Sequence, residues 1–140
     1  MGGLNYLLDS NVIAEPVRPH PNKNVLRRLE AHKGELCSAS IVFHEILYGI
    51  FRLTDSKKKQ YLTNYLRDAV QPAIQFFPYD HEAAVWHAKE RARLEGMGKN
   101  PSFADGQIAS IAYVNSLVVV TRNIDDFLNF DGLRVENWFV

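Results

Sequence analysis

Short apolar runs alternate with longer segments of helical periodicity along most of this chain. The most apolar run, residues 117–120, reads Leu-Val-Val-Val and predicts a buried strand. Residues 4–8, 36–39 and 74–77 are further strand candidates, and residues 133–136 form a weak last one. Strands that alternate with helices need crossover connections, which favour parallel pairing. We therefore expect an α/β fold with a central, mostly parallel sheet of four to five strands, flanked by helices on both faces.

Capping residues and helix breakers set the expected helix boundaries. Asn22, Ser40 and Asp80 are residue types that commonly cap helix N-termini. Pro16 is expected to stop a short helical turn, and Pro101 to occupy the first turn of a later helix. The predicted helices span residues 12–14, 23–31, 41–51, 57–70, 81–94 and 101–112.

The composition is typical of a soluble globular domain. Its 140 residues are 46% apolar and 23% charged, and 16 basic residues balance 16 acidic ones, which argues against a strongly basic nucleic-acid binder. Cys37 is the single cysteine, so an intrachain disulfide is excluded. The sequence shows no signal-peptide pattern and no apolar stretch near the roughly 18 residues of a membrane helix. We expect one domain, residues 1–140, in the cytoplasm.

Polar residues follow two of the predicted strands at their carboxyl ends. Asp9 comes directly after the first strand, with Asn11 two residues on. Thr121 and Asn123 follow the most apolar strand, and Asp126 lies one turn into a short helix after them. Sites in open α/β sheets form beyond these strand ends, so we expect the residues to share one site. The alternative for Asp9 is a purely local role as a helix cap.

Two further acids lie at helix positions. Glu45 interrupts residues 41–51, the most apolar helix of the chain, which we expect to be largely buried. A buried carboxylate without a partner is costly, so Glu45 has either a functional role or a place on an exposed stripe with Arg52 and Tyr48. Asp105 falls near a helix start, where the helix dipole alone favours an acid.

Four segments of the chain resemble one known family. They read Leu-Leu-Asp-Ser-Asn-Val at 7–12, Ser-Ile-Val-Phe-His-Glu-Ile-Leu-Tyr-Gly at 40–49, Ala-Asp-Gly-Gln-Ile-Ala at 104–109 and Val-Thr-Arg-Asn-Ile-Asp-Asp-Phe at 120–127. In these segments the chain is similar to PIN-domain ribonucleases of the VapC toxin type. Ser10 departs from the commoner threonine but keeps the hydroxyl group. The resemblance implies a three-layer PIN-like fold and a nuclease made of a single domain.

The resemblance also implies which residues form the site. Four carboxylates are expected to form it: Asp9, Glu45, Asp105 and Asp126. Three polar side chains are expected to support them: Asn11, Thr121 and Asn123. Asp125 is expected to point into solvent, since neighbouring helical residues project about 100° apart. Arg122 is expected to contact a substrate phosphate, because it lies beside the predicted site.

A cluster of four carboxylates needs a way to relieve its charge. Two carboxylates about 5 Å apart repel each other by about 3 kcal/mol at an effective dielectric constant of 20, against a net domain stability of roughly 5–15 kcal/mol. Oxygen ligands without a thiolate favour Mg²⁺, with Mn²⁺ as a substitute. Asp9, Asp105 and Asp126 would be the metal ligands. Glu45 would bind through water or orient the attacking water.

The resemblance further implies partners: an RNA substrate, a VapB-like cognate antitoxin and a second copy in a homodimer. Several aromatic residues fit either a partner surface or the core: Phe43, Tyr48, Phe51, Tyr61 and Tyr65. Two other functions stay open, a catalytically weak PIN-like interaction module and another metal-dependent phosphoesterase. The presence of all four acids argues against the weak module. A phosphatase of the aspartyl-phosphate type is disfavoured, because it needs a second aspartate where this chain has Asn11.

Overall fold

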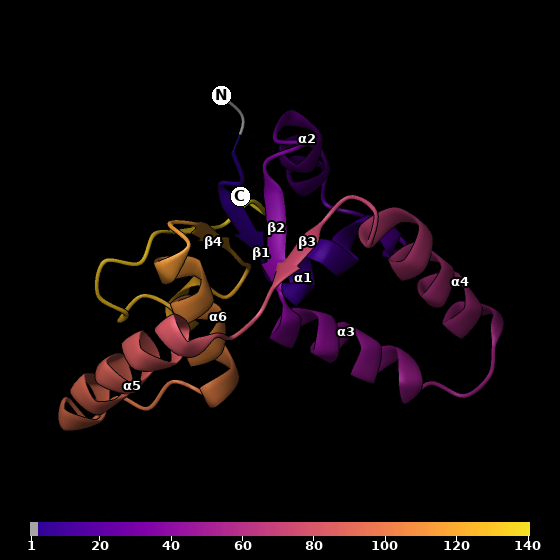
Figure 1. The fold of residues 1–140 in the computed structure, drawn as a ribbon. Coiled ribbons are helices and arrows are strands. Elements are labelled where there is room, and N and C mark those ends of the chain that lie inside the picture. The colour runs from indigo at the N-terminus through magenta and orange to yellow at the C-terminus, as the bar shows by residue number, and fades with distance from the viewer. Residues whose placement is uncertain (1–2) are drawn as a thin grey trace.

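Five parallel strands form the central sheet of the computed structural model, which describes residues 3–140 (Figure 1). The strands are β1 (Tyr6–Leu8), β2 (Leu36–Ala39), β3 (Gln75–Phe77), β4 (Val118–Val120) and β5 (Val135–Glu136). Their spatial order is β3-β2-β1-β4-β5, and every neighbouring pair is parallel. The expected α/β fold with a parallel sheet is confirmed.

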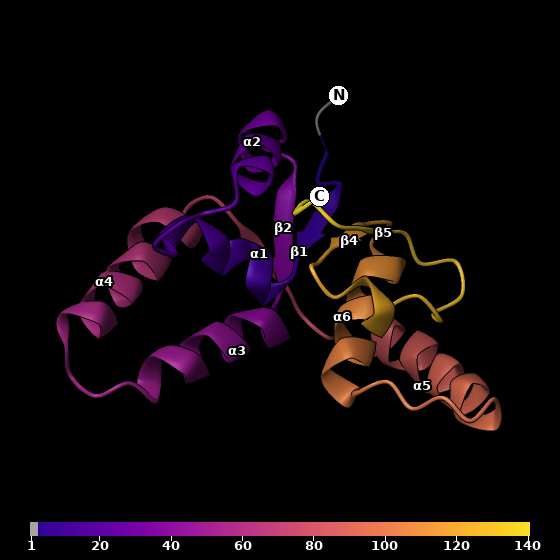
Figure 2. The same cartoon turned by 180° about the vertical axis from the view of Figure 1, so that it is seen from behind.

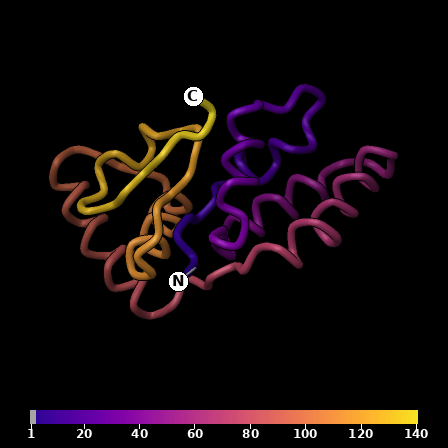
Figure 3. The backbone as a smooth tube through the Cα atoms, turned by 90° about the horizontal axis from the view of Figure 1, so that it is seen from above, coloured from indigo at the N-terminus to yellow at the C-terminus, as the bar shows by residue number. Residues whose placement is uncertain are grey.

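Helices cover both sides of this sheet. They are α1 (Ser10–Ala14), α2 (Lys23–Ala31), α3 (Ser40–Phe51), α4 (Lys57–Tyr65), α5 (His81–Gly96) and α6 (Phe103–Val114), with the shorter turns η1 (Glu15–Val17), η2 (Leu66–Val70) and η3 (Ile124–Asp126). The pair α3 and α4 lies on one side of the strands, and the pair α5 and α6 lies on the other (Figures 2 and 3). Within residues 3–140, none of the helices has the length and apolar character that crossing a bilayer requires.

Two predicted helix caps are confirmed by their hydrogen bonds. The Asn22 side chain accepts from two backbone amides at the start of α2, and the Asp80 side chain accepts from the amide of Ala83 in α5. These caps satisfy amides that have no partner inside the helix. Helix ends are less well predicted. The predicted helix at 57–70 changes from α4 into the π-helical turn η2, and α5 continues two residues beyond its predicted end.

Three predictions near prolines and caps are wrong. Pro16 does not stop the first helical turn, because the chain continues as the 3-10 helix η1 with proline at its start, where no backbone N–H is needed. Ser40 is the first residue of α3, so the cap position belongs to Ala39, which makes no side-chain cap. Pro101 does not lie in the first turn of α6, because it precedes the N-cap residue Ser102.

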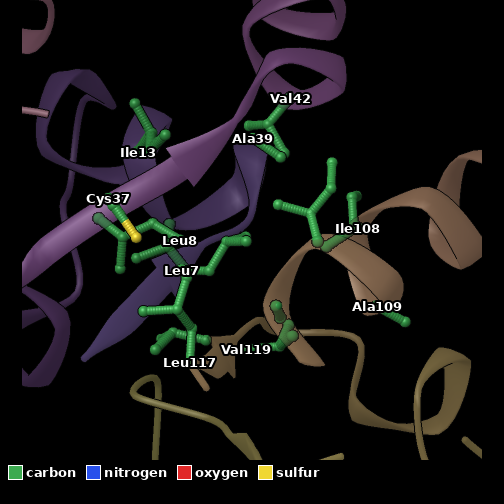
Figure 4. Packing of buried hydrophobic residues seen from close by; sticks show 14 of the residues in the cluster. Leu7, Leu8, Ile13, Cys37, Ala39, Val42, Ile108, Ala109, Leu117 and Val119 are labelled. Atoms are coloured by element: carbon green, nitrogen blue, oxygen red, sulfur yellow. The ribbon is translucent and has the colours of Figure 1, made fainter. Parts of the chain in front are cut away.

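The core holds the central strands against α6 and α3. Leu7 and Leu8 of β1 and Val119 of β4 are completely buried, together with Ile108 of α6 (Figure 4). Burying each such side chain contributes about 1.5–3 kcal/mol. Because Leu8 pairs with Val120, β1 and β4 end side by side at the same edge of the sheet. The residues that follow both strands are therefore held close together.

Helix α3 is not largely buried, which corrects the prediction from its apolar composition. Val42 and Ile50 are its buried residues, whereas Tyr48 is 56% exposed and Phe51 is 68% exposed. The reason is its place in the fold, since α3 projects away from the strands and packs with α4 as an arm (Figure 1). Only one face of such a helix has a core to pack against.

A buried carboxylate on α5 fixes the segment that follows η3. Glu90 is 8% exposed and accepts two hydrogen bonds from the Arg93 guanidinium, at 2.9 and 2.8 Å. It also accepts from the backbone amide of Asp131 at 2.7 Å, and these donors hold the pKa of Glu90 below its usual range. Arg93 in turn donates to the carbonyl oxygen of Asn129. The contact ties α5 to the loop that comes after the predicted site residue Asp126.

Replacing Glu90 should destabilise the fold markedly. We expect Glu90→Ala to lower the free energy of unfolding by about 2–3 kcal/mol, because it leaves the Asp131 amide and the Arg93 fork without their acceptor. Urea denaturation measures this loss. Lys89→Ala, an exposed neighbour on the same helix, is the control and should change stability by no more than about 0.5 kcal/mol. Equal stability of the two variants would contradict the role of Glu90.

Candidate active site

Asp9 lies at the carboxyl end of β1 and is 7% exposed. Its Oδ1 accepts from the backbone amide of Ser10 at 2.8 Å, which makes it the N-cap of α1. Its Oδ2 accepts from the Thr121 hydroxyl at 2.8 Å and, more weakly, from the side-chain amide of Asn11 at 3.4 Å. Asp9 therefore caps a helix as the alternative predicted, but its role is not purely local, because its other oxygen bonds to Thr121 at the neighbouring strand end.

The polar residues after β4 are tied to those after β1. The Thr121 hydroxyl, which donates to Asp9, accepts from the backbone amide of Asn123 at 3.0 Å. The side-chain oxygen of Asn11 accepts from the backbone amide of Arg122 at 3.1 Å. Each side chain thus bridges the two strand ends. The structure brings Asp9 and its three predicted supporting residues together at one edge of the sheet.

Glu45 reaches this edge from α3. The residue is solvent-accessible, yet partial burial of its carboxyl group raises its pKa, and the charges of Asp9 and then Asp105 raise it further. The predicted exposed stripe also exists, because Glu45, Tyr48 and Arg52 are all exposed. Along it, the Arg52 guanidinium lies 4.8 Å from the ring centroid of Tyr48. Arg52 is not among the charges that shift the pKa of Glu45. The charges that act on Glu45 are those of Asp9 and Asp105, which raise its pKa, and that of the adjacent His44, which lowers it.

Asp105 lies in the first turn of α6 and is half-buried. Burial raises its pKa most, the hydrogen bond with Ser102 lowers it, and the charges of Asp126 and Asp9 raise it. Ser102 is the N-cap of the helix and accepts from the Asp105 amide at 3.1 Å. The sequence analysis did not single out Ser102, although a serine three residues before an acid at a helix start is a capping signal.

Asp126 and Asp125 differ in what they approach. Both are exposed residues of η3. The charge of Asp126 raises the pKa of Asp105, whereas Asp125 does not act on any of the shifted acids. This difference agrees with the expectation that only Asp126 belongs with the other three acids.

The four acids form one electrostatic group without touching. Among residues 3–140, no three histidine, cysteine, aspartate or glutamate side chains lie close enough together to hold a metal ion as they stand. The donor set is nevertheless oxygen-only, and burial together with repulsion from the other acids keeps the pKa of Glu45 and Asp105 raised. A hard divalent cation fits such donors and would relieve the repulsion. The oxygen atoms are thus suitable ligands by type, and the carboxylates would have to move closer together to bind an ion.

Arg122 points away from the acids. Its guanidinium lies 4.8 Å from the ring centroid of Phe139, in the C-terminal segment, and the residue is exposed. It does not contribute to the pKa shifts of Glu45 or Asp105. Contact between Arg122 and a phosphate stays a prediction. It would require the side chain to leave the Phe139 ring.

A cavity of about 520 Å³ adjoins the acidic edge. Glu45, Asn11 and Asn123 line it beside apolar side chains from α1, α3 and α4. The predicted aromatic surface is present in part. Tyr48, Phe51 and Tyr61 are exposed, whereas Phe43 packs on Phe76 and Tyr65 donates its hydroxyl to the carbonyl of Ile13. The arm of α3 and α4 therefore offers an apolar groove that leads to the acids.

Comparison with known proteins places the chain among toxins and ribonucleases. Residues 6–133 match the PIN domain family. The chain is 35% identical to Toxin FitB of Neisseria gonorrhoeae, over 94% of this chain and 97% of that protein. It is 31% identical to VapC ribonuclease Y4jK of Sinorhizobium fredii, over 86% and 89% of the two chains.

Solved structures show the same architecture. The crystal structure of FitAcB from Neisseria gonorrhoeae matches with a TM-score of 0.89 at 34% identity, over 96% of this chain and 98% of that one. The DNA-bound VapBC of Salmonella typhimurium matches with a TM-score of 0.82 at 26% identity, over 96% and 98% of the chains. The match to the PIN domain family, over residues 6–133, includes all four predicted acids.

The raised pKa of Asp105 predicts a stability effect. An acid whose pKa is raised by folding is destabilising when charged, so the free energy of unfolding falls as pH rises past its usual pKa of about 4. In metal-free buffer at pH 7, Asp105→Asn should melt at the same temperature as the wild type or higher. The difference should vanish at pH 3, where the carboxyl group is protonated in both states.

Thermal scans at the two pH values measure this effect. Asp125→Asn is the matched control, because it removes an exposed acid that does not act on the group, and it should leave both melting temperatures unchanged. A clearly lower melting temperature for Asp105→Asn at pH 7 would mean that the charge of Asp105 supports the fold instead.

Proposed function

Because the chain belongs to the PIN-domain family, we propose that it is a metal-dependent endoribonuclease that cuts RNA at its four-carboxylate site. It is a VapC-type ribonuclease toxin of a toxin–antitoxin system, in agreement with the resemblance in its sequence motifs. The observation that carries the assignment of the site is the hydrogen bond from Thr121 to Asp9, which places an acid at the joint end of β1 and β4 beside the shifted acids Glu45 and Asp105.

The acids would hold Mg²⁺, or Mn²⁺ in its place. Asp9, Asp105 and Asp126 would be ligands, directly or through water, and Glu45 would bind through water or orient the attacking water. Such an ion, when bound, activates water and stabilises the charge that develops on a phosphodiester. The negative charge of the four carboxylates must also be neutralised before RNA can bind, because free carboxylates would repel the phosphate backbone.

The side chains around the acids have distinct tasks in this mechanism. Thr121 and Asn11 donate to Asp9 Oδ2, so this oxygen keeps a fixed direction while its partner oxygen stays on the α1 amide. Ser102 holds the first turn of α6 and with it Asp105. Glu45 stands across from these residues on α3, where its raised pKa suits it to accept a proton from water. Arg122 would leave Phe139 to contact a substrate phosphate.

A cognate antitoxin is the expected protein partner. The structural relatives are VapBC and FitAB complexes, including DNA-bound ones. The groove on the arm of α3 and α4 fits this partner, because its lining is mostly apolar and includes Glu45. Tyr48 and Phe51 are exposed elsewhere on α3. A segment bound there would cover the acids and stop RNA from reaching them. We further propose that the toxin forms a homodimer.

RNA cleavage by purified protein tests the site. Asp9→Asn should reduce Mg²⁺- or Mn²⁺-dependent cleavage by at least about a hundredfold, since it removes ligand charge with almost no change in volume. Asp125→Asn should cleave like the wild type. Far-ultraviolet circular dichroism of each variant controls for folding. Full activity of a folded Asp9→Asn variant would refute the assignment of Asp9.

Metal binding should stabilise the folded protein. An ion that binds only the folded state adds about 2.7 kcal/mol at a hundredfold excess over its Kd, which raises the melting temperature of a domain this size by about 6–14 °C. Mn²⁺ should act at lower concentration than Mg²⁺. Thermal scans of chelator-treated protein against added metal measure the rise. If Asp9→Asn responded like the wild type, the ion would bind elsewhere.

A further inference from the structure

His87 of α5 is a buried histidine that the proposed chemistry does not use. It is 4% exposed, and the Tyr79 hydroxyl lies 2.8 Å from its Nδ1. The hydroxyl pins the ring in one orientation, because a buried nitrogen is costly to leave without its hydrogen bond. The described part of the chain includes no ionic partner for His87, so its position must serve something other than charge pairing.

The free edge of this ring presses on the backbone of Gly106. A methyl group built on Gly106 would lie 2.1 Å from His87 Nε2, 2.7 Å from its Cδ2 and 2.9 Å from its Cε1. The imidazole therefore occupies the volume that any side chain at position 106 would need. Glycine is required here for a close approach, and the width of the ring sets how closely α5 packs on α6.

The ring contacts both sides of a predicted metal ligand. Gly106 directly follows Asp105, and Phe103 precedes it by two residues, with its ring centroid 4.9 Å from that of His87. The first turn of α6 is thus contacted by one imidazole at Gly106 and Phe103, while Asp105 is close enough to Asp126 and Asp9 for their charges to raise its pKa. Moving the imidazole would let the first turn of α6 shift and the Asp105 carboxylate with it, because Phe103, Asp105 and Gly106 belong to the same turn.

We propose that His87 is a positioning residue for Asp105: through Gly106 and Phe103 it sets the depth at which the first turn of α6 presents its carboxylate to the other acids. The inference rests on the proposed function, because it gives His87 a task in the metal site. Metal sites and reacting groups tolerate little displacement, and a shift of about 1 Å is enough to lower activity by about a hundredfold. The ring fixed by Tyr79 and the absence of a side chain at Gly106 together keep the Asp105 carboxylate in place.

Gly106→Ala tests the contact directly. The added methyl group displaces the ring or the turn, so the variant should need about tenfold more Mn²⁺ for half of its thermal stabilisation. Its kcat for RNA cleavage should fall by about tenfold or more while KM stays within about twofold, since the groups that bind RNA are untouched. His87→Ala should shift both properties in the same direction, because it removes the ring that contacts Gly106 and Phe103 in the first turn of α6.

Two further variants separate positioning from general loss of packing. Ile111→Val removes one methylene from a buried position later on α6 and should lower the melting temperature without changing the Mn²⁺ midpoint or kcat. Tyr79→Phe releases the ring with almost no change in volume and should shift both in the direction of Gly106→Ala, but less. It also keeps the test decisive if Gly106→Ala does not fold.

The inference is overturned if folded Gly106→Ala, or Tyr79→Phe in its place, keeps the wild-type Mn²⁺ midpoint and kcat. It is also overturned if folded His87→Ala keeps the wild-type Mn²⁺ midpoint and kcat, since the turn would then hold its place without the ring. A wild type that cleaves no RNA would refute the proposed function, and the Mn²⁺ midpoints would still decide the role of His87.

Discussion

The pairing of β1 with β4 is the constraint on which the rest of the site depends. It sets Leu8 beside Val120, so that the chain leaves both strands at the same edge of the sheet. Asp9 and Thr121 are 112 residues apart in sequence, yet they meet in a buried hydrogen bond of 2.8 Å. That bond, with the two bridges made by Asn11, leaves the Asp9 carboxylate little freedom. This hydrogen bond therefore fixes the position of Asp9, near which the other acids lie.

Glu45 and Asp105 come from elements on opposite sides of the sheet. Glu45 is carried by the arm of α3 and α4, and Asp105 by the pair of α5 and α6 (Figure 1). Burial raises the pKa of both carboxyl groups most, and the charges of neighbouring acids raise it further. Sites of this kind trade stability for function, since the repulsion is relieved only when a cation or a proton is present. The two layers must therefore be held firmly by contacts away from the acids.

Those contacts differ between the two sides. On the side of α5 and α6 they are dense: Glu90 fixes the loop after η3, and His87 fills the space over Gly106. On the side of α3 and α4 the packing is thinner: aromatic side chains stay exposed on these helices, and a mostly apolar groove lies between α1, α3 and α4. The first arrangement suits a support for metal ligands. The second suits a surface that a protein partner covers. Because Glu45 lines its groove, a partner bound there would also block the acids.

The sequence by itself determined the local features of this protein. Apolar runs predicted the strands of a parallel sheet, and Asn22 and Asp80 predicted helix starts. Both kinds of feature depend on residues that are close together in the sequence. Its motifs pointed to the acids and to the family. Only the tertiary structure decided the rest. The exposure of α3 depends on how far it projects from the sheet, and the contact between His87 and Gly106 depends on how closely two helices pack. Neither distance follows from a pattern along the chain, because both are set by elements remote in sequence.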